Sequence, residues 1–153
     1  MQAKPILCLD LDGCIHRYSR GWQDGTLYDG MVDGFVEWAL KAMKHFQLVV
    51  YSSRSKEPTG ITQMQNWFRD QLQPLGWQMT DRHADYMRLL HAWRAEVLMF
   101  YFAHEKPPAF LTIDDRAIQF RGDWSAWWLA VDKLKDFKPW TVAKPECDPP
   151  EPA

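Results

Sequence analysis

Two aspartates stand close together where an apolar run near the start of the chain ends. Residues 6–9 are apolar and have strand propensity, and Asp10, Leu11, Asp12 and Gly13 follow them. Two carboxylates this close repel each other and tend to share a proton, unless a cation keeps both ionised. The pattern fits an acidic turn after a strand, and it equally fits carboxylate chemistry at a strand end. Residues later in the chain decide between these interpretations.

Two further apolar runs also end in polar residues. Residues 46–51 lead into Ser52, and residues 109–113 lead into Asp114 and Asp115. Because ligands bind beyond the carboxyl ends of parallel strands, at one edge of the sheet, we expect these residues to converge with the first pair of aspartates. The combination of hydroxyl and carboxylate groups at one sheet edge favours a site over an acidic turn.

Helical patterns alternate with the predicted strands. Apolar residues recur at helical spacing over 31–44, 59–72 and 84–96, and a last tryptophan-rich helix is expected after a short strand at 118–120. The apolar stretch 97–102 fits either an extension of the helix before it or a strand. The alternation predicts an α/β fold, namely a three-layer α/β/α Rossmann-like parallel sheet with helices on both faces.

One domain is expected over residues 1–138, with residues 14–30 as an irregular flap or minimal cap. The pair Asp24-Gly25 is a turn signal that would close a short hairpin in this flap. Residues 139–153 are rich in proline and lack apolar periodicity, which predicts an extended or disordered tail.

The composition limits the class of protein. The chain has 153 residues, 46% of them hydrophobic, and a net charge of −2, so it fits one globular domain without a basic surplus for nucleic-acid binding. Three cysteines without a CxxC pair favour a reducing compartment, and we expect a cytoplasmic protein. The first strand begins too early to leave room for a signal peptide, and no apolar run is long enough to span a bilayer.

Four short motifs occur in a characteristic order. They are Asp10-Leu11-Asp12-Gly13, the apolar run ending in Ser52, Lys106, and the pair Asp114-Asp115. In this order and spacing the chain resembles the haloacid dehalogenase-like (HAD) hydrolases over roughly residues 5 to 135. The resemblance implies a HAD-like fold. The short segment between the first motif and the first helix then implies a capless or minimally capped phosphatase.

The resemblance also implies a role for each motif. Asp10 is the nucleophile that forms a covalent phosphoryl intermediate, and Asp12 is the general acid and base. Ser52 donates a hydrogen bond to the transferring phosphoryl group, and Lys106 offsets its charge and that of Asp10. An acidic residue at position 12 favours hydrolysis of phosphate esters over dehalogenation or ion pumping.

A divalent cation fits the charge of this set. Four carboxylates against one lysine leave an excess of negative charge even before a phosphate dianion binds. Mg²⁺ suits such an oxygen-only site and tolerates retained waters. The resemblance assigns its ligands to the Asp10 side chain, the Asp12 backbone carbonyl and the Asp114 side chain, while Asp115 acts through hydrogen bonds or water.

Two neighbours of the second motif are expected to touch the substrate. They are Ser53 and Arg54, and the run Ser52-Ser53-Arg54 is similar to the Thr-Gly-Arg turn of polynucleotide 3′-phosphatases in the superfamily. Cys14 has no adjacent base of obvious placement, so a cysteine nucleophile is not favoured. A receiver domain is excluded, because its phosphorylated aspartate follows a middle strand where this chain has Tyr51-Ser52.

Three functions are consistent with these motifs. The first hypothesis is a Mg²⁺-dependent phosphomonoesterase that acts on a small phosphorylated metabolite or nucleotide. The alternatives are a nucleic-acid 3′-end phosphatase and a weakly active phosphate-binding or interaction module. A nucleic-acid partner is less favoured on net charge, no membrane partner is expected, and the motifs predict no oligomeric state.

Overall fold

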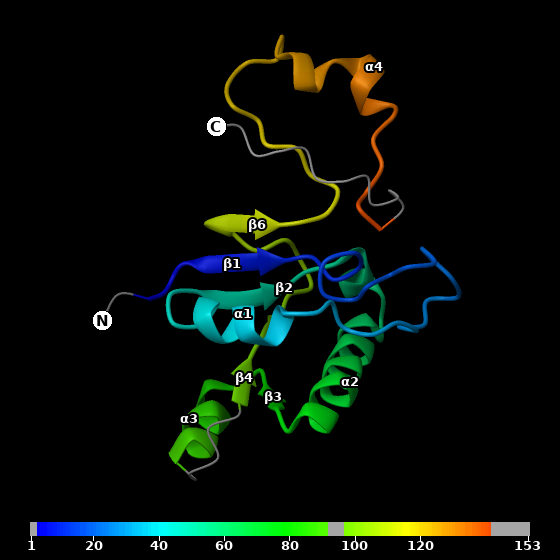
Figure 1. Cartoon of the computed structure of the whole chain (residues 1–153). Coiled ribbons are helices and arrows are strands. Elements are labelled where there is room, and N and C mark those ends of the chain that lie inside the picture. The colour runs from blue at the N-terminus through cyan, green and yellow to red at the C-terminus, as the bar shows by residue number, and fades with distance from the viewer. Residues whose placement is uncertain (1–2, 92–96, 142–153) are drawn as a thin grey trace.

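The strand that the sequence predicts just before Asp10 is a central strand of a parallel sheet. The structure, a computed structural model, describes residues 3–91 and 97–141. Its main sheet has the order β5-β2-β1-β6. The strands in chain order are β1 (Ile6–Leu9), β2 (Gln47–Val50), β5 (Tyr101–Phe102) and β6 (Leu111–Ile113). Figure 1 shows β6, β1 and β2 running in the same direction, which confirms the predicted α/β fold with a parallel sheet.

The stretch 97–102 is a strand, not an extension of a helix. It is divided into β4 (Val97–Met99), which pairs with β3 (Gln78–Thr80), and β5, which pairs with β2. The division lies at Phe100, whose backbone N–H donates to the Thr80 carbonyl at 3.1 Å. Its β-branched and aromatic neighbours and its full burial favour a strand over a helix at this point.

Three helices lie between the strands, and of these α1 is clearly shorter than its apolar pattern. They are α1 (Phe35–Ala42), α2 (Gly60–Leu72) and α3 (His83–His91). Helix α1 starts after Gly34, whose φ of 82° is left-handed and breaks the pattern that begins at residue 31. The last residues of the helix predicted over 84–96 lie outside the described residues. Two short 3₁₀ turns follow β2 and α2, namely η1 (Ser53–Lys56) and η2 (Gln73–Leu75).

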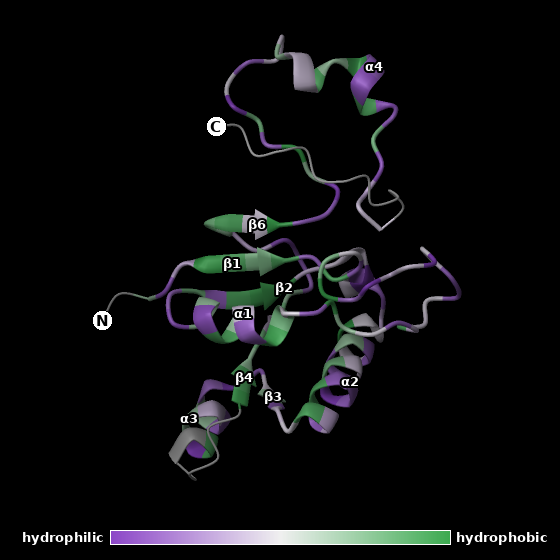
Figure 2. Ribbon diagram, in the orientation of Figure 1, coloured by the Kyte–Doolittle hydropathy of each residue, from purple (hydrophilic) through white to green (hydrophobic). Residues whose placement is uncertain are grey.

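One hydrophobic core joins α1 and α2 to the same face of the sheet. Alternate residues of β1 and β2 contribute to it, because side chains two apart share a face of a strand. Phe35 of α1 packs against Phe68 of α2 and against Phe100, with ring centroids 6.3 and 5.7 Å apart. Burial of each such side chain stabilises the fold by about 1.5–3 kcal/mol. Figure 2 shows β1 and β2 as hydrophobic ribbons beside helices that carry mixed colours.

The flap (residues 14–30) is closed at its base, not by a short hairpin at its tip. The Val32 N–H donates to the Ile15 carbonyl at 2.8 Å, and the Arg17 N–H donates to the Gly30 carbonyl at 3.0 Å. The expected turn at its tip is present, but no strands flank it. The flap is therefore a wide loop that returns beside the end of β1.

The chain leaves the sheet after β6 and follows an irregular path that stands away from it (Figure 1). The strand predicted at 118–120 is wrong, since no described strand lies beside it to pair with. The predicted last helix is reduced to η3 (Trp127–Leu129) and α4 (Val131–Leu134), separated by Ala130 with an extended ψ of 129°. Many apolar side chains of this segment are exposed.

Residues 142–153, most of the predicted tail, lie outside the described residues, and the domain limit at 138 stays a prediction. No helix in the described parts of the chain combines the length and the apolar character needed to cross a bilayer.

Candidate active site

Asp10 follows β1 directly, and a second carboxylate and a thiol lie beside it. Ligand atoms of Asp10, Cys14 and Asp115 all lie within 4.8 Å of one another. The Asp10 N–H donates to the Ile113 carbonyl at 3.0 Å, which ties the end of β1 to the end of β6. The convergence of these two strand ends, expected from the rule for parallel sheets, is thus present.

Gly13 allows Asp115 to reach this position. Its φ of 83° is left-handed, and a Cβ atom at this residue would clash with the Asp115 carboxylate. Both carboxylate oxygens of Asp115 are buried and have no hydrogen-bond partner among the described residues. An unpartnered buried carboxylate is costly, unless a cation or a protonated group completes it.

Asp12 has very different surroundings from Asp10. Its Oδ1 accepts a hydrogen bond from His16 Nδ1 at 2.8 Å, and its Oδ2 accepts one from Arg54 Nε at 2.7 Å. Arg54 Nη2 also donates to Oδ1 at 3.2 Å, so the guanidinium grips the carboxylate with two bonds. His16 and Arg54 are both buried. Asp12 is therefore a fixed, paired carboxylate.

His16 connects Asp12 to the flap. Its Nε2 accepts a hydrogen bond from the Asp29 N–H at 3.0 Å, so the hydrogen-bond network assigns the proton of the neutral ring to Nδ1, facing Asp12. The Asp29 carbonyl in turn accepts a bond from Trp67 Nε1 of α2 at 3.0 Å. The far end of the flap is thereby held against both Asp12 and α2.

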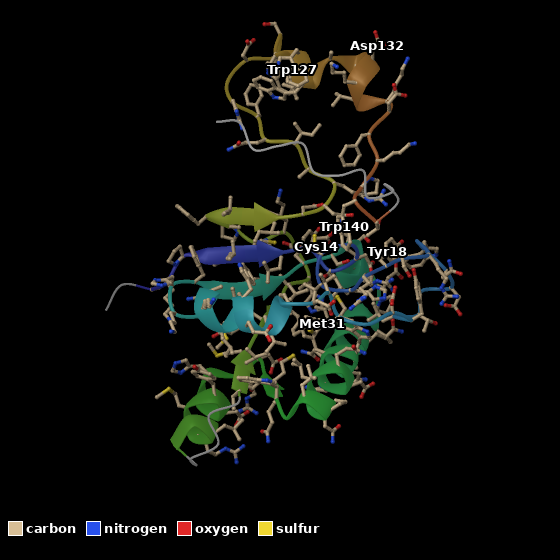
Figure 3. The ribbon with its side chains drawn as sticks, in the orientation of Figure 1. Cys14, Tyr18, Met31, Trp127, Asp132 and Trp140 are labelled. Carbon is tan, nitrogen blue, oxygen red and sulfur yellow. The ribbon has the colours of Figure 1, made fainter. Side chains whose placement is uncertain are left out.

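Tyr18 begins the exposed part of the flap in a strained conformation. Its φ of 56° makes it the one non-glycine residue with positive φ in the described chain. The strain of such a residue costs about 1–3 kcal/mol and persists where the surroundings enforce it. Its ring packs against His16, with centroids 5.8 Å apart. Figure 3 shows Tyr18 and Cys14 close to the end of β1.

The other predicted site residues are not part of the group formed by Asp10, Cys14 and Asp115. Ser52 is buried directly after β2, and its Oγ accepts the Arg54 N–H at 3.4 Å, while Ser53 is exposed. Lys106 is exposed, between β5 and β6, and makes no hydrogen bond or ion pair with another described residue. Asp114 is also exposed, and its Oδ1 accepts the backbone N–H two residues later at 2.8 Å.

Comparison with known proteins identifies the family. A family model described as the HAD domain in Swiss Army Knife RNA repair proteins matches residues 6–138. The chain belongs to this HAD family. No curated protein and no solved structure matches it. The resemblance drawn from the four motifs is confirmed, and the fold is the α/β Rossmann-like fold of HAD domains. HAD membership indicates a hydrolase of the phosphatase type.

The surroundings of Asp10 and Asp12 in this HAD domain shift their pKa values in opposite directions. Burial raises the pKa of Asp10 to about 7, and the carboxylates of Asp114, Asp115 and Asp12 add to the rise. Burial also tends to raise the pKa of Asp12, but the hydrogen bonds from His16 and Arg54 outweigh it and hold this pKa below its ordinary value. Asp12 is thus ionised at neutral pH, whereas Asp10 is partly protonated.

The residues beside Asp10 fit the Mg²⁺ that the superfamily implies. Burial raises the pKa of Asp115 as well, so two adjacent carboxylates are both disfavoured as free anions. Burial and the carboxylates raise the pKa of the Cys14 thiol to about 12, which leaves it protonated and a poor ligand for a hard cation. The same rise removes Cys14 as a nucleophile. Asp115, not Asp114, is the neighbour that lies in this group with Asp10.

Two residues beside Asp12 differ from the predicted set. His16 was not among the predicted site residues, because it lies in a loop without periodicity, and its spacing of four residues from Asp12 is the one signal that could have pointed to it. Arg54 was predicted to bind substrate, which stays a prediction, and in the structure its guanidinium pairs with Asp12. Trp140 Nε1 donates to the Gly13 carbonyl at 2.6 Å, and Figure 3 shows this residue close to Cys14.

Proposed function

We propose that the protein is a Mg²⁺-dependent phosphomonoesterase that forms a phospho-aspartate at Asp10 and acts on phosphorylated ends of RNA. The observation that carries the proposal is the unequal pair at the end of β1. Asp10 stands beside Asp115, whose oxygens accept no hydrogen bond from a described residue and whose ion pair with Arg116 is long, at 3.9 Å. Asp12, in contrast, is held by His16 and Arg54. The family description, which refers to RNA repair proteins, favours RNA ends over small metabolites.

In this mechanism an oxygen of Asp10 attacks the phosphorus atom, and the bond from phosphorus to the leaving oxygen breaks. Asp12 gives its proton to the leaving oxygen, then takes a proton from the water that attacks the aspartyl phosphate. Inorganic phosphate leaves, and both carboxylates return to their initial states. A phosphate dianion beside Asp12 disfavours its ionised form, so we expect Asp12 to take up from the solvent, when substrate binds, the proton that the first step requires.

Asp10 and Asp115 are the residues that we expect to hold Mg²⁺, with the Asp12 carbonyl and the Asp114 side chain as the further ligands implied by the family. The ion would keep Asp10 ionised and neutralise charge on the phosphoryl group. Ser52, which is buried just beyond the end of β2, is proposed to donate to that group, and Lys106 is proposed to add positive charge when phosphate binds.

The test compares a short RNA with a 3′-phosphate, the same RNA with a 5′-phosphate, nucleoside monophosphates, sugar phosphates and phenyl phosphate. We expect phosphate release with Mg²⁺, none with EDTA, and the highest kcat/KM with an RNA end. Turnover that survives in Asp10→Asn contradicts the nucleophile, and a preference for sugar phosphates contradicts the substrate. Folded protein that binds Mg²⁺ but releases no phosphate from any substrate favours an interaction module.

Aspartyl phosphorylation is tested separately with beryllium fluoride, a mimic of the phosphoryl group. We expect the adduct on Asp10 in a crystal structure with Mg²⁺. An adduct on another carboxylate, or none in the presence of bound Mg²⁺, contradicts the covalent mechanism.

A further inference from the structure

A groove lies on the side of Arg54 away from Asp12. Its volume is about 720 Å³, within the range of pockets that hold small ligands. The flap forms one wall through Trp22 and residues 24–27, and α2 forms the opposite wall. Residues 57–59, between η1 and α2, also line it. The groove is not part of the carboxylate cluster, and the mechanism above does not use it.

Arg54 contacts both this groove and Asp12, the proposed general acid and base. Its guanidinium binds both oxygens of Asp12, and its Nη1 donates to the Gly25 carbonyl in the flap wall. The same guanidinium lies 4.9 Å from the centroid of the Trp22 ring. Because Asp12 protonates the leaving oxygen in the proposed function, the leaving group must lie on the side of Asp12. The groove therefore borders the space into which the leaving group extends.

Trp22 offers a stacking surface in this groove. Its side chain is 58% exposed, although its ring is held by the Arg54 guanidinium. An indole fixed by a cation on one side and open on another is suited to stack on a flat ring, and every nucleobase has such a face. Stacking of one base on an aromatic side chain changes affinity by about ten- to a hundredfold.

The opposite wall offers hydrogen bonds to the edge of a base. Gln63, Asn66 and Asp70 occupy one face of α2, at positions three and four apart, while its other face is buried. Asp70 makes no hydrogen bond or ion pair with any other residue that the structure describes, so its carboxylate is available as an acceptor. Exocyclic amino groups of guanine, adenine and cytosine are donors, and uracil has none.

The charge of the groove excludes the phosphodiester chain itself. Three acidic residues line it, namely Asp24, Glu57 and Asp70, and its one cation, Arg54, is occupied by Asp12. A chain of phosphates would be repelled, whereas an uncharged base is not. The groove thus fits a single base better than a length of RNA backbone.

We infer that this groove binds the base of the nucleotide that carries the scissile phosphate, stacked on Trp22 and with its amino group bonded to Asp70. The inference rests on the proposed function, and it specifies that function further, because it predicts a preference for terminal nucleotides with an amino group. It assigns the flap the role of a specificity element.

The test measures binding without turnover. Guanosine 3′-monophosphate is titrated calorimetrically, with Mg²⁺, into Asp10→Asn, and then into the same protein with Trp22→Ala, Trp22→Phe or Trp124→Ala added. Trp124 is 80% exposed on the irregular C-terminal segment and is the matched control. We expect Trp22→Ala to weaken binding at least tenfold, Trp22→Phe to recover most of the affinity, and Trp124→Ala to change nothing. Equal affinity in Trp22→Ala overturns the inference.

Base selection is tested with RNA trinucleotides that end in guanosine or uridine 3′-phosphate. We expect wild-type protein to prefer guanosine and Asp70→Ala, which removes the acceptor, to lose most of that preference, measured as the ratio of the two kcat/KM values. Equal rates on both ends in wild-type protein overturn the role of Asp70. Failure of the proposed function is distinct, because phosphate release from RNA ends would then be absent or slower than from sugar phosphates, whereas calorimetry measures binding of the nucleotide alone.

Discussion

Replacement of Asp10 by asparagine should stabilise the metal-free protein, and the gain should grow with pH. The pKa of Asp10 is about 7 in the folded protein, well above the value of about 4 for an aspartate in an unfolded chain. Below about pH 4 both states hold the proton, so Asp10 then carries no charge and causes no loss. Between pH 4 and 7 the folded state binds more protons than the unfolded state, and stability falls as pH rises.

The size of the effect follows from the raised pKa. A difference of about three pKa units corresponds to about 4 kcal/mol, an upper bound because the Asp10 side chain keeps some contact with water. Asparagine has nearly the same shape and keeps an oxygen that accepts hydrogen bonds, but it has no charge. Between pH 5 and pH 8 we expect the advantage of Asp10→Asn to grow by about 2 kcal/mol, or about 4–8 °C in Tm.

The assay is thermal and urea unfolding at pH 5, 6.5 and 8 in EDTA, with Asp132→Asn as the control because that side chain is 93% exposed. Mg²⁺ should raise the Tm of wild-type protein at pH 8 but raise that of Asp10→Asn much less. If Asp10→Asn is no more stable than wild type at pH 8, or if its gain is equal at pH 5 and 8, the assignment of Asp10 to a charge-strained site is wrong.

Three further substitutions test the surroundings of the two aspartates. Gly13→Ala places a side chain at a φ of 83° and against Asp115, so we expect at least a tenfold loss of Mg²⁺ affinity in a thermal-shift titration, and an unchanged titration contradicts the packing. Arg54→Gln removes a charge that lowers the pKa of Asp12, so the basic limb of the kcat profile, on which Asp12 loses the proton that the first step requires, should move to higher pH; an unmoved limb separates Arg54 from the proton transfer. His16→Phe should lower kcat at least tenfold and expose the flap to protease, whereas His16→Asn should keep part of the activity because its amide can still donate to Asp12; equal rates in both variants remove His16 from the site.

The sequence was sufficient to predict the strands that carry the site. Residues 6–9 and 48–50 are apolar without interruption, as strands buried on both faces are, and Asp10 and Ser52 lie within two residues of where they end. The strand at 97–102 was ambiguous because a short apolar run fits a helix and a strand equally well. Its neighbours in the sheet, which are distant in the chain, decide the question.

The details of the site depend on loop conformation, which periodicity does not report. Asp114 and Asp115 are adjacent, and which of them reaches Asp10 is decided by the turn after β6 and by the space at Gly13. The hydrogen bond between His16 and Asp12 likewise depends on the loop conformation of the flap, which no sequence pattern predicts. The pairing of Arg54 depends on η1, a single turn whose capping by Ser52 directs the guanidinium inward.

The register of β1 has a consequence for how the protein folds. Its two neighbours in the sheet lie at very different distances along the chain, because Leu7 pairs with both Leu48 of β2 and Leu111 of β6. Until β6 has paired, one edge of β1 stays open, and neither Asp115 nor the hydrogen bond from Asp10 to Ile113 is in place. Such distant pairings form slowly, because a long loop must close before they contribute. The group of Asp10, Cys14 and Asp115 should therefore form late in folding, and a chain in which β6 has not yet paired should lack the proposed metal site.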